Sequence, residues 1–535
     1  MLRNPMARLA LAAVFFAGTA TAFAQAGNPD QSPPSHPITV TPIPTGPPPT
    51  GQARLMPFPR GAAPTPTKPQ SNSPELDREL VSRPISLDDA IAVALVNNPS
   101  LAAAGQSLYA AQGRLSEARA GFSPTVAVAP GESYIHRVAA EAYGIQATLP
   151  IDISHLVAAA SDEAKFQEVA ARLDINRTRN NVVYQVENAF YGALRAQALV
   201  NVADENLQNS MERLRDAGAR YEARAVAYID VVRAQTDVAN DQRGVIQAKN
   251  TVSNAIALLA NAMGIDVTTN LRITDQGAVV QPPNPEKPQP FDPMKPLPAQ
   301  PPASGQPSDV HEAGADNGLQ LGPEFRSVLA EALANRPEPM EVDADIAAAK
   351  KGVQVARRSE LPSLAVSVGY YDLRTQSGSF VNEPQAYVGL SIPLYDGGVA
   401  RARIQQANAN VASFITQKRQ VTDAVTLDVQ QAYLSLVQAR DQVAVAGQAL
   451  TQAREGFSLA KVRYQTGVSA RAGISPLLEL SDAQAALTLA EQNQVNALYD
   501  YNAARAQLDR SAARFAYVGN GPGYPAVPSD KTLGK

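Results

Sequence analysis

The chain has 535 residues, of which 46 are basic and 50 acidic, and it contains neither cysteine nor tryptophan. Without a thiol there can be no disulfide, thiolate metal site, cysteine nucleophile or lipid-modified N-terminal cysteine. A formal net charge of -4 offers no basic excess for a phosphate backbone, so no nucleic acid partner is expected.

The chain opens with a predicted export signal and an extended segment. Basic residues precede an apolar run and small residues follow it, which predicts a cleavable secretory signal over residues 1–24. Prolines crowd residues 25–84 and again residues 279–318, and both stretches are interpreted as extended linkers. No later stretch holds the roughly 20 uninterrupted apolar residues of a membrane-spanning helix. Any membrane crossing is therefore expected to use strands.

The rest of the sequence is a duplicated plan. Pro99 recurs as Pro337 and Tyr221 recurs as Tyr464, and many neighbouring residues recur with them. The spacing between matching residues changes twice along the chain, which implies two insertions at loop positions. The predicted segments are residues 85–278 for the first copy, 319–517 for the second copy and 518–535 for a C-terminal tail.

Each copy contains two segments in which apolar residues alternate with small or polar ones. They lie around Val126 and Val128, from Tyr143 to Ile151, from Val366 to Tyr370, and from Tyr387 to Leu394. Alternation alone fits a soluble sheet with one face on a core equally well. Because the flanking regions offer no apolar layer to cover a sheet, a bilayer is the favoured burial surface. Four strands cannot close a barrel alone, so their edges are expected to pair with other subunits.

Long helices are predicted after each strand pair. Residues 155–218 form a run of helix-favouring sequence, and the second copy runs similarly from Gly398 toward Tyr464. At 1.5 Å per residue, about 64 helical residues reach roughly 95 Å, far beyond a small domain. Shorter returning helices are predicted over residues 227–263 and 475–516. An ordinary coiled-coil stalk would show the same alanine-rich stripe.

Several short motifs accompany the repeat and the strand pairs. They are Ala94-Leu95 with Pro99, the strand end Pro393-Leu394-Tyr395-Asp396-Gly397-Gly398, and the second-tip signature Arg463-Tyr464-x-x-Gly467 followed by Leu478-Glu479-Leu480 and Ala483-Gln484. Together these features resemble the TolC family of outer-membrane efflux proteins. The resemblance covers about residues 85–264 and 323–516.

The resemblance implies a mainly α fold with a membrane β-barrel portion. In this fold a homotrimer forms a 12-stranded barrel that continues into an α-helical periplasmic tunnel. It further implies the exit channel of a tripartite efflux pump or a type I secretion system, which conducts substrates passively from the periplasm to the exterior. The implied location is the outer membrane, with a periplasmic extension. The implied partners are a periplasmic adaptor protein, an inner-membrane transporter that supplies the energy, and outer-membrane lipid.

The resemblance also assigns roles at the helix tips. Glu479 and Asp482, three positions apart, would form acidic rings at a narrow periplasmic entrance and favour cations. A solvated helix surface is the alternative interpretation of both acids. Asp230 and Tyr464 would be acceptor and donor in a contact that locks the closed state. The family's lock arginine is replaced by serine here, and Arg471 is the substitute suggested.

The first tip departs from the family pattern, because Arg224 stands where glycine is usual. Arg220 lies one helical turn earlier. Either arginine could contact an adaptor or pair with Asp230, and the sequence does not rank these options. Together with Arg463 and Gly467, the two arginines of the first tip are the predicted adaptor contacts.

Nothing in the sequence predicts catalysis. The four histidines lie apart without metal-binding spacing, and no phosphate-binding loop or nucleophile elbow occurs. Neither an enzymatic activity nor a cofactor is therefore expected. The competing hypothesis is a periplasmic coiled-coil adaptor or scaffold protein without a pore, and the alternating strand pairs favour the channel.

Overall fold

The structure of the chain is a computed structural model. The described residues are 83–135, 138–275, 277–282, 322–374, 380–467 and 475–514. The predicted signal and the predicted C-terminal tail lie outside them. So do all but the ends of the two proline-rich segments.

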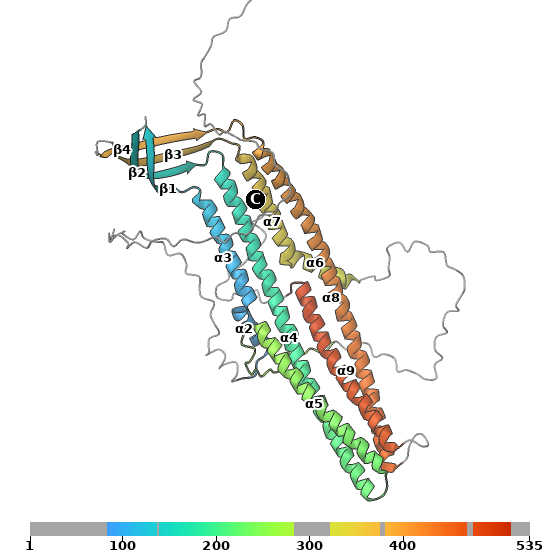
Figure 1. The fold of residues 1–535 in the computed structure, drawn as a ribbon. Coiled ribbons are helices and arrows are strands. Elements are labelled where there is room, and N and C mark those ends of the chain that lie inside the picture. Colours follow the sequence, from blue (N-terminus) through green and yellow to red (C-terminus); the bar gives the residue numbers. More distant parts are fainter. Residues whose placement is uncertain are drawn as a thin grey trace, which may run out of the picture. The chain divides into compact units, whose positions relative to one another are not determined.

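The first half of the chain forms two short helices, a strand pair and a long helical hairpin (Figure 1). Its elements are α2 (Leu87–Asn97), α3 (Pro99–Ala120), β1 (Thr125–Ile135), β2 (Val138–Ile151), α4 (Leu156–Glu222) and α5 (Tyr228–Met263). Helix α2 begins at a capping box, in which Ser86 and Asp89 each accept the other's backbone N–H. Helix α4 has 67 residues and is therefore about 100 Å long.

The second half repeats this order of elements. They are α6 (Pro323–Asn335), α7 (Pro337–Arg358), β3 (Ser363–Arg374), β4 (Phe380–Ser391), α8 (Val399–Thr466) and α9 (Pro476–Ser511). Several predicted extents differ from the structure, and β2, β3 and α4 each run further than predicted. The last strand ends at Ser391 rather than Leu394, and α9 ends at Ser511 rather than at residue 516. Strand β1 has 11 residues and extends well beyond the predicted segment around Val126 and Val128.

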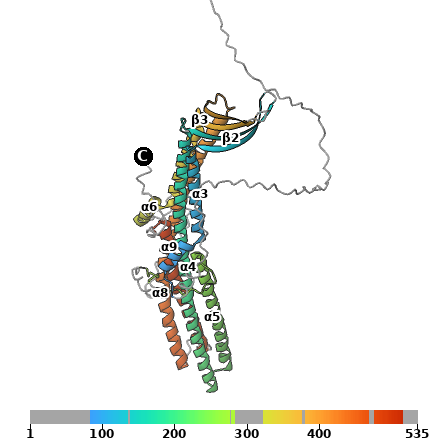
Figure 2. The same cartoon turned by 90° about the vertical axis from the view of Figure 1, so that its left-hand side faces the viewer.

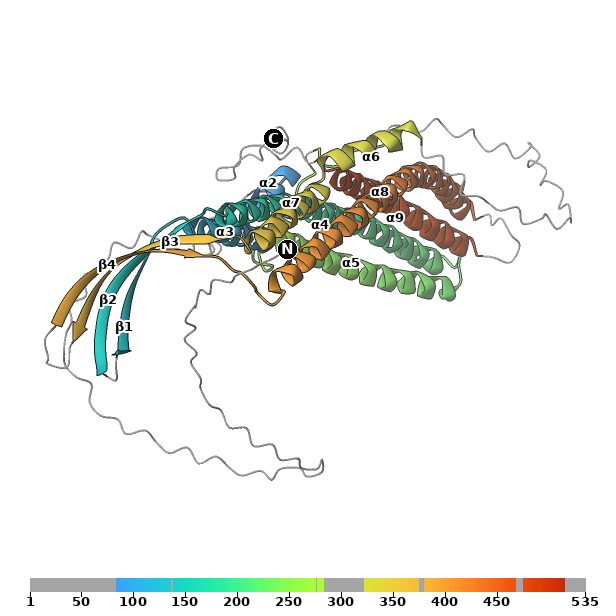
Figure 3. The ribbon, with the colours of Figure 1, turned by 90° about the horizontal axis from the view of Figure 1, so that it is seen from above.

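The four strands form one antiparallel sheet in the order β1-β2-β3-β4, which Figure 3 shows as a curved layer. The register places Val128 opposite Ile145, Ile145 opposite Tyr370, and apolar pairs along the same face beyond them. On the other face Thr148 lies opposite Ser367, and their hydroxyls are 3.0 Å apart. The alternation seen in the sequence thus becomes one apolar and one polar face.

The apolar face of the sheet is open to its surroundings. Val128 is 70% exposed, Val388 is 66% exposed and Tyr370 is 51% exposed. Strands β1 and β4 each have one hydrogen-bonded neighbour among the described strands, so each leaves an edge unpaired. Within the described ranges, no helix combines the length and the apolar character needed to cross a bilayer.

The long helices pack side by side in an order that changes along their length. Toward the helix tips, α4 lies between α5 and α9, and α9 packs on α8. Toward the strands, α4 packs on α3 and α7, and α7 packs on α8. Figures 1 and 2 both show α4 beside α5. The two hairpins therefore form one layer near the tips, with α5 and α8 at its edges.

The short helices close a core around the middle of the long ones. Ile91 of α2, Phe190 of α4 and Met263 of α5 are almost completely buried in one apolar cluster. In the second half, Phe325 of α6 and Val429 of α8 belong to the matching cluster. These two cores hold the hairpins to the segments that lead into the sheet.

A buried carboxyl group lies beside this core. Glu187 of α4 has one carboxyl oxygen buried without a hydrogen-bond partner in the described structure. Burial raises the pKa of Glu187 to about 8, and the negative charges of Asp509 and Asp88 act in the same direction against the positive charge of Arg505. Glu187 is thus largely protonated at neutral pH.

Candidate functional site: the two helix tips

Each hairpin ends in a tip where the chain reverses. The first tip lies between Glu222 at the end of α4 and Tyr228 at the start of α5. The second lies between Thr466 at the end of α8 and Pro476 at the start of α9. Arg471 falls in the second turn, outside the described residues, so its role in the lock stays a prediction.

Both tips turn at a residue with left-handed backbone geometry. Gly467 ends α8 with a φ of 71°, and its N–H donates to the carbonyl of Tyr464. Arg224 occupies the matching place in the first tip with a φ of 60°, and its N–H donates to the carbonyl of Tyr221 at 2.8 Å. Glycine adopts this geometry without steric cost, whereas a side chain does not. The departure at Arg224 is therefore a strained position.

All four long helices meet in a buried cluster just before the turns. Tyr464 is 5% exposed and Asp230 is 7% exposed. The cluster's apolar members besides Tyr464 are Ala217, Ala234, Ala460, Leu477 and Leu480. Two residues predicted to form the lock thus lie in the same interior, at the junction of the two hairpins.

Arg220 reaches from the first hairpin into this junction. Its Nη1 donates a hydrogen bond of 2.9 Å to the backbone carbonyl of Tyr464. Its guanidinium carbon lies 4.1 Å from the centroid of the Tyr464 ring, and its Nε lies 3.2 Å from the carboxylate of Asp216. The ion pair of Asp230 is formed instead with Arg233, at 3.8 Å. The structure therefore pairs Arg220 with Tyr464 and Asp216.

The hydroxyl group of Tyr464 is buried among negative charges. Burial, the contact with the Asp216 carboxylate and the negative charge of Asp230 together raise the pKa of Tyr464 to about 12, against the positive charge of Arg220. No hydrogen bond of full geometry joins this hydroxyl to an acceptor among the described residues. The structure brings Asp230 and Tyr464 together, and the bond between them stays a prediction.

The predicted entrance acids have different surroundings. Glu479 accepts a hydrogen bond from Arg463, so this ion pair joins α8 to α9 within the second hairpin. Its side chain is 22% exposed, whereas Asp482 belongs to the exposed residues of α9. The charge of Glu479 is thus compensated inside its own hairpin.

A polar seam that the sequence did not reveal joins the hairpins above the tips. Asn206 of α4 donates to Asp241 of α5 at 2.7 Å and accepts from Gln484 of α9 at 3.1 Å. Ser481 of α9 donates to Asp237 of α5 at 2.9 Å. The signal that could have revealed this seam is the occurrence of polar residues within the alanine-rich stripes.

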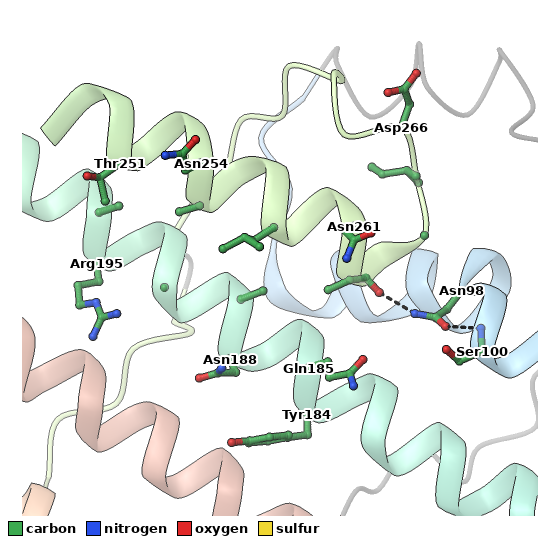
Figure 4. A pocket seen from close by; sticks show the side chains of 18 of the residues that line it. Asn98, Ser100, Tyr184, Gln185, Asn188, Arg195, Thr251, Asn254, Asn261 and Asp266 are labelled. Atoms are coloured by element: carbon green, nitrogen blue, oxygen red, sulfur yellow. Dashed lines mark hydrogen bonds between the residues drawn. The ribbon is translucent and has the colours of Figure 1, made fainter. Parts of the chain in front are cut away.

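A surface groove of about 1020 Å³ lies between α4 and α5, close to the start of α3. Figure 4 shows Asn188 and Arg195 lining it from α4. The side chain of Asn98 donates to the carbonyl of Ala262 and accepts the N–H of Ser100, both at 2.9 Å. These bonds fix the junction of α2 and α3 against the end of α5.

The comparisons with known proteins agree with this architecture. A family model described as outer membrane efflux protein matches residues 90–265 and 328–514, one segment in each half of the chain. The chain belongs to the outer membrane efflux protein family. It is therefore an outer-membrane efflux channel and not an enzyme, which confirms the predicted family, function and location.

Individual proteins with which this chain can be aligned cover most of its length. Protein CyaE of Bordetella pertussis is 26% identical over 80% of this chain and 85% of its own. The pyoverdine export outer membrane protein OpmQ of Pseudomonas putida is 25% identical over 81% and 86%, respectively. A crystal structure of a membrane protein from Pseudomonas aeruginosa shares the fold, with a TM-score of 0.63 at 18% identity over 80% of this chain and 93% of that one.

Proposed function

We propose that three copies of this efflux channel protein form the exit duct of a tripartite efflux pump or a type I secretion system. The exposed apolar face of the sheet carries the proposal. In lipid every backbone polar group needs a partner, and β1 and β4 each leave one edge unpaired. Four strands from each of three copies would close a 12-stranded barrel, within the range of outer-membrane barrels.

The edges of the helical layer support the same assembly. Ile246 and Leu258 on α5 are 62% and 65% exposed. Leu427, Val445 and Leu459 on α8 are 55%, 66% and 60% exposed. Packing α5 of one copy against α8 of the next would bury these side chains and close a helical tunnel. The same proposal includes the segments predicted from the sequence: a signal over residues 1–24, proline-rich segments over 25–84 and 279–318, two copies over 85–278 and 319–517, and a tail over 518–535.

The surface of the first tip supports contact with a periplasmic adaptor protein. The rings of Tyr221 and Tyr228 lie 5.5 Å apart, and both side chains are exposed together with Ile229. Exposed aromatic and apolar side chains at one site favour a protein partner. Arg224 and Arg463 lie on the tips as well, and Arg220 is the less accessible of the three arginines. An inner-membrane transporter would supply the energy.

The residues at the entrance are proposed to have the roles expected from the family resemblance. Glu479 and Asp482 would be repeated around the threefold axis and would attract cations, with Arg463 offsetting the first of them. Asp230 and Tyr464 would hold the closed state. Their burial in the junction of the hairpins supports this role.

The oligomeric state and the conductance test this proposal. We expect the mature protein, extracted from outer membranes, to run as a heat-modifiable trimer and to conduct ions in planar bilayers. Val388→Arg places a charge on the apolar face and should reduce trimer recovery, whereas Gln385→Arg on the opposite face should preserve it. A soluble monomer that does not enter liposomes would contradict the proposal and favour the adaptor or scaffold hypothesis.

A further inference from the structure

We propose that Arg220 is the latch that holds the first hairpin to the second at the tips, so that releasing it opens the entrance. The proposal rests on the proposed channel function and concerns how the entrance is kept shut. It assigns to Arg220 a positioning role inside the protomer, where the sequence suggested an adaptor contact or a partner for Asp230.

Arg220 caps the last turn of a helix in the other hairpin. The last carbonyls of an α-helix lack partners within the helix, and the C-terminal end attracts positive charge. Tyr464 lies in the last turn of α8, and Arg220 donates to its carbonyl at 2.9 Å. A guanidinium from the first hairpin therefore caps a helix of the second hairpin.

The contacts of Arg220 use several properties of arginine together. The Nε side of the guanidinium faces Asp216, one turn earlier on α4, while Nη1 bonds to the Tyr464 carbonyl. The flat face of the group lies over the Tyr464 ring, with its carbon 4.1 Å from the centroid. A lysine has one compact ammonium group and cannot make this set of contacts. The side chain of Arg220 is 27% exposed, so water screens it only in part.

The contact between Arg220 and Tyr464 lies at the ends of both helices. Arg220 lies two residues before the end of α4, and Tyr464 lies two residues before the end of α8. Moving the tips apart must break this contact. The ion pair of Arg463 with Glu479 lies within the second hairpin and can remain intact when the tips separate. The two arginines therefore differ in whether they resist opening.

Substitution of Arg220 in the full chain tests the latch. In planar bilayers, Arg220→Gln should raise the open probability severalfold, and Arg220→Lys should resemble Arg220→Gln because lysine cannot cap and stack at once. Arg454→Gln is the matched control, because Arg454 pairs with Glu491 within the second hairpin, and it should keep the open probability of the wild type. Conducting wild-type channels with an unchanged open probability in Arg220→Gln would overturn the latch.

Hydrogen exchange separates the latch from the channel function. In Arg220→Gln, the backbone amides at the ends of α4 and α8 should exchange several times faster than in the wild type, whether or not the protein conducts. Faster exchange without any conductance in the wild type would support the latch and reject the channel. Unchanged exchange would reject the latch whatever the conductance.

Discussion

At the first tip Tyr221 is 44% exposed and Arg220 reaches across to the other hairpin, whereas at the second tip Tyr464 is 5% exposed and Arg463 stays within its own hairpin. The same Arg-Tyr pair thus serves two different purposes in the two copies. One tyrosine fills the junction between the hairpins, and the other packs beside Tyr228 on the surface. Duplication supplied two equal motifs, and packing around one shared interior made them unequal.

The largest expected difference between the copies is at the tyrosines. Tyr464→Ala removes a buried aromatic ring and should lower the free energy of unfolding by about 3 kcal/mol. It should also raise single-channel conductance, as should Asp230→Ala, because both weaken the junction. Tyr221→Ala is the matched control and should change stability by less than about 1 kcal/mol. Equal losses in chemical denaturation would show that the copies are equivalent at this position.

A second difference lies at Glu187, whose counterpart in the second copy is Gln430. Since the pKa of Glu187 in the folded chain is about 8 rather than 4.5, the folded state binds the proton more tightly than the unfolded state. The contribution of this group to stability is therefore present below about pH 4.5 and is lost as the pH rises toward 8. Glu187→Gln should raise the free energy of unfolding on the order of 2 kcal/mol at pH 9 and change it little at pH 4. Thermal unfolding across this range checks the effect, and parallel pH curves for variant and wild type would contradict it.

The third difference is the backbone strain at the two turns, which should be reversed when glycine replaces Arg224 and arginine replaces Gly467. Arg224→Gly relieves a positive φ and should stabilise the first hairpin by about 1 kcal/mol. Gly467→Arg imposes the same strain on the second hairpin and should destabilise it by about 1 kcal/mol. The midpoint of denaturant unfolding measures both changes. Shifts in the same direction would contradict this account of the turns.

The smallest effects on stability are expected at the ion pair of the second tip. Arg463→Gln or Glu479→Gln should cost less than about 1 kcal/mol, because the pair is partly exposed. Their effects on ion selectivity should have opposite signs: Arg463→Gln should increase the preference for cations and Glu479→Gln should reduce it. Reversal potentials in a salt gradient measure this preference. Shifts of the same sign would argue against a position near the permeation path.

The elements were predictable where their signal is local. Period-two alternation revealed all four strands, and the absence of helix breakers revealed the long helices. The strand end at Leu394 was wrong because alternation continues past the last paired residue. Ser391 lies opposite Ser363, the first residue of β3, so beyond it no partner backbone remains. The sequence of one strand does not show where the strand paired with it begins.

The roles of the tip residues were only partly predictable, for a different reason. Arg220 and Tyr464 are far apart in the sequence, and the contact between them depends on how α4 and α8 are rotated against each other. The resemblance named Asp230 and Tyr464, which do share a buried cluster. It could not tell that Arg220 crosses between the hairpins while Arg463, with the same local sequence, does not.

The open edges of β1 and β4, together with the exposed apolar face, have a consequence for biogenesis. A single protomer in the aqueous periplasm exposes an apolar sheet face and two unpaired strand edges, and both features promote aggregation. The yield of refolded protein should therefore be highest at an intermediate protein concentration, because the proposed assembly of protomers competes with aggregation. In the proposed assembly, a protomer would need a chaperone to cover these surfaces until neighbouring copies and a bilayer bury them.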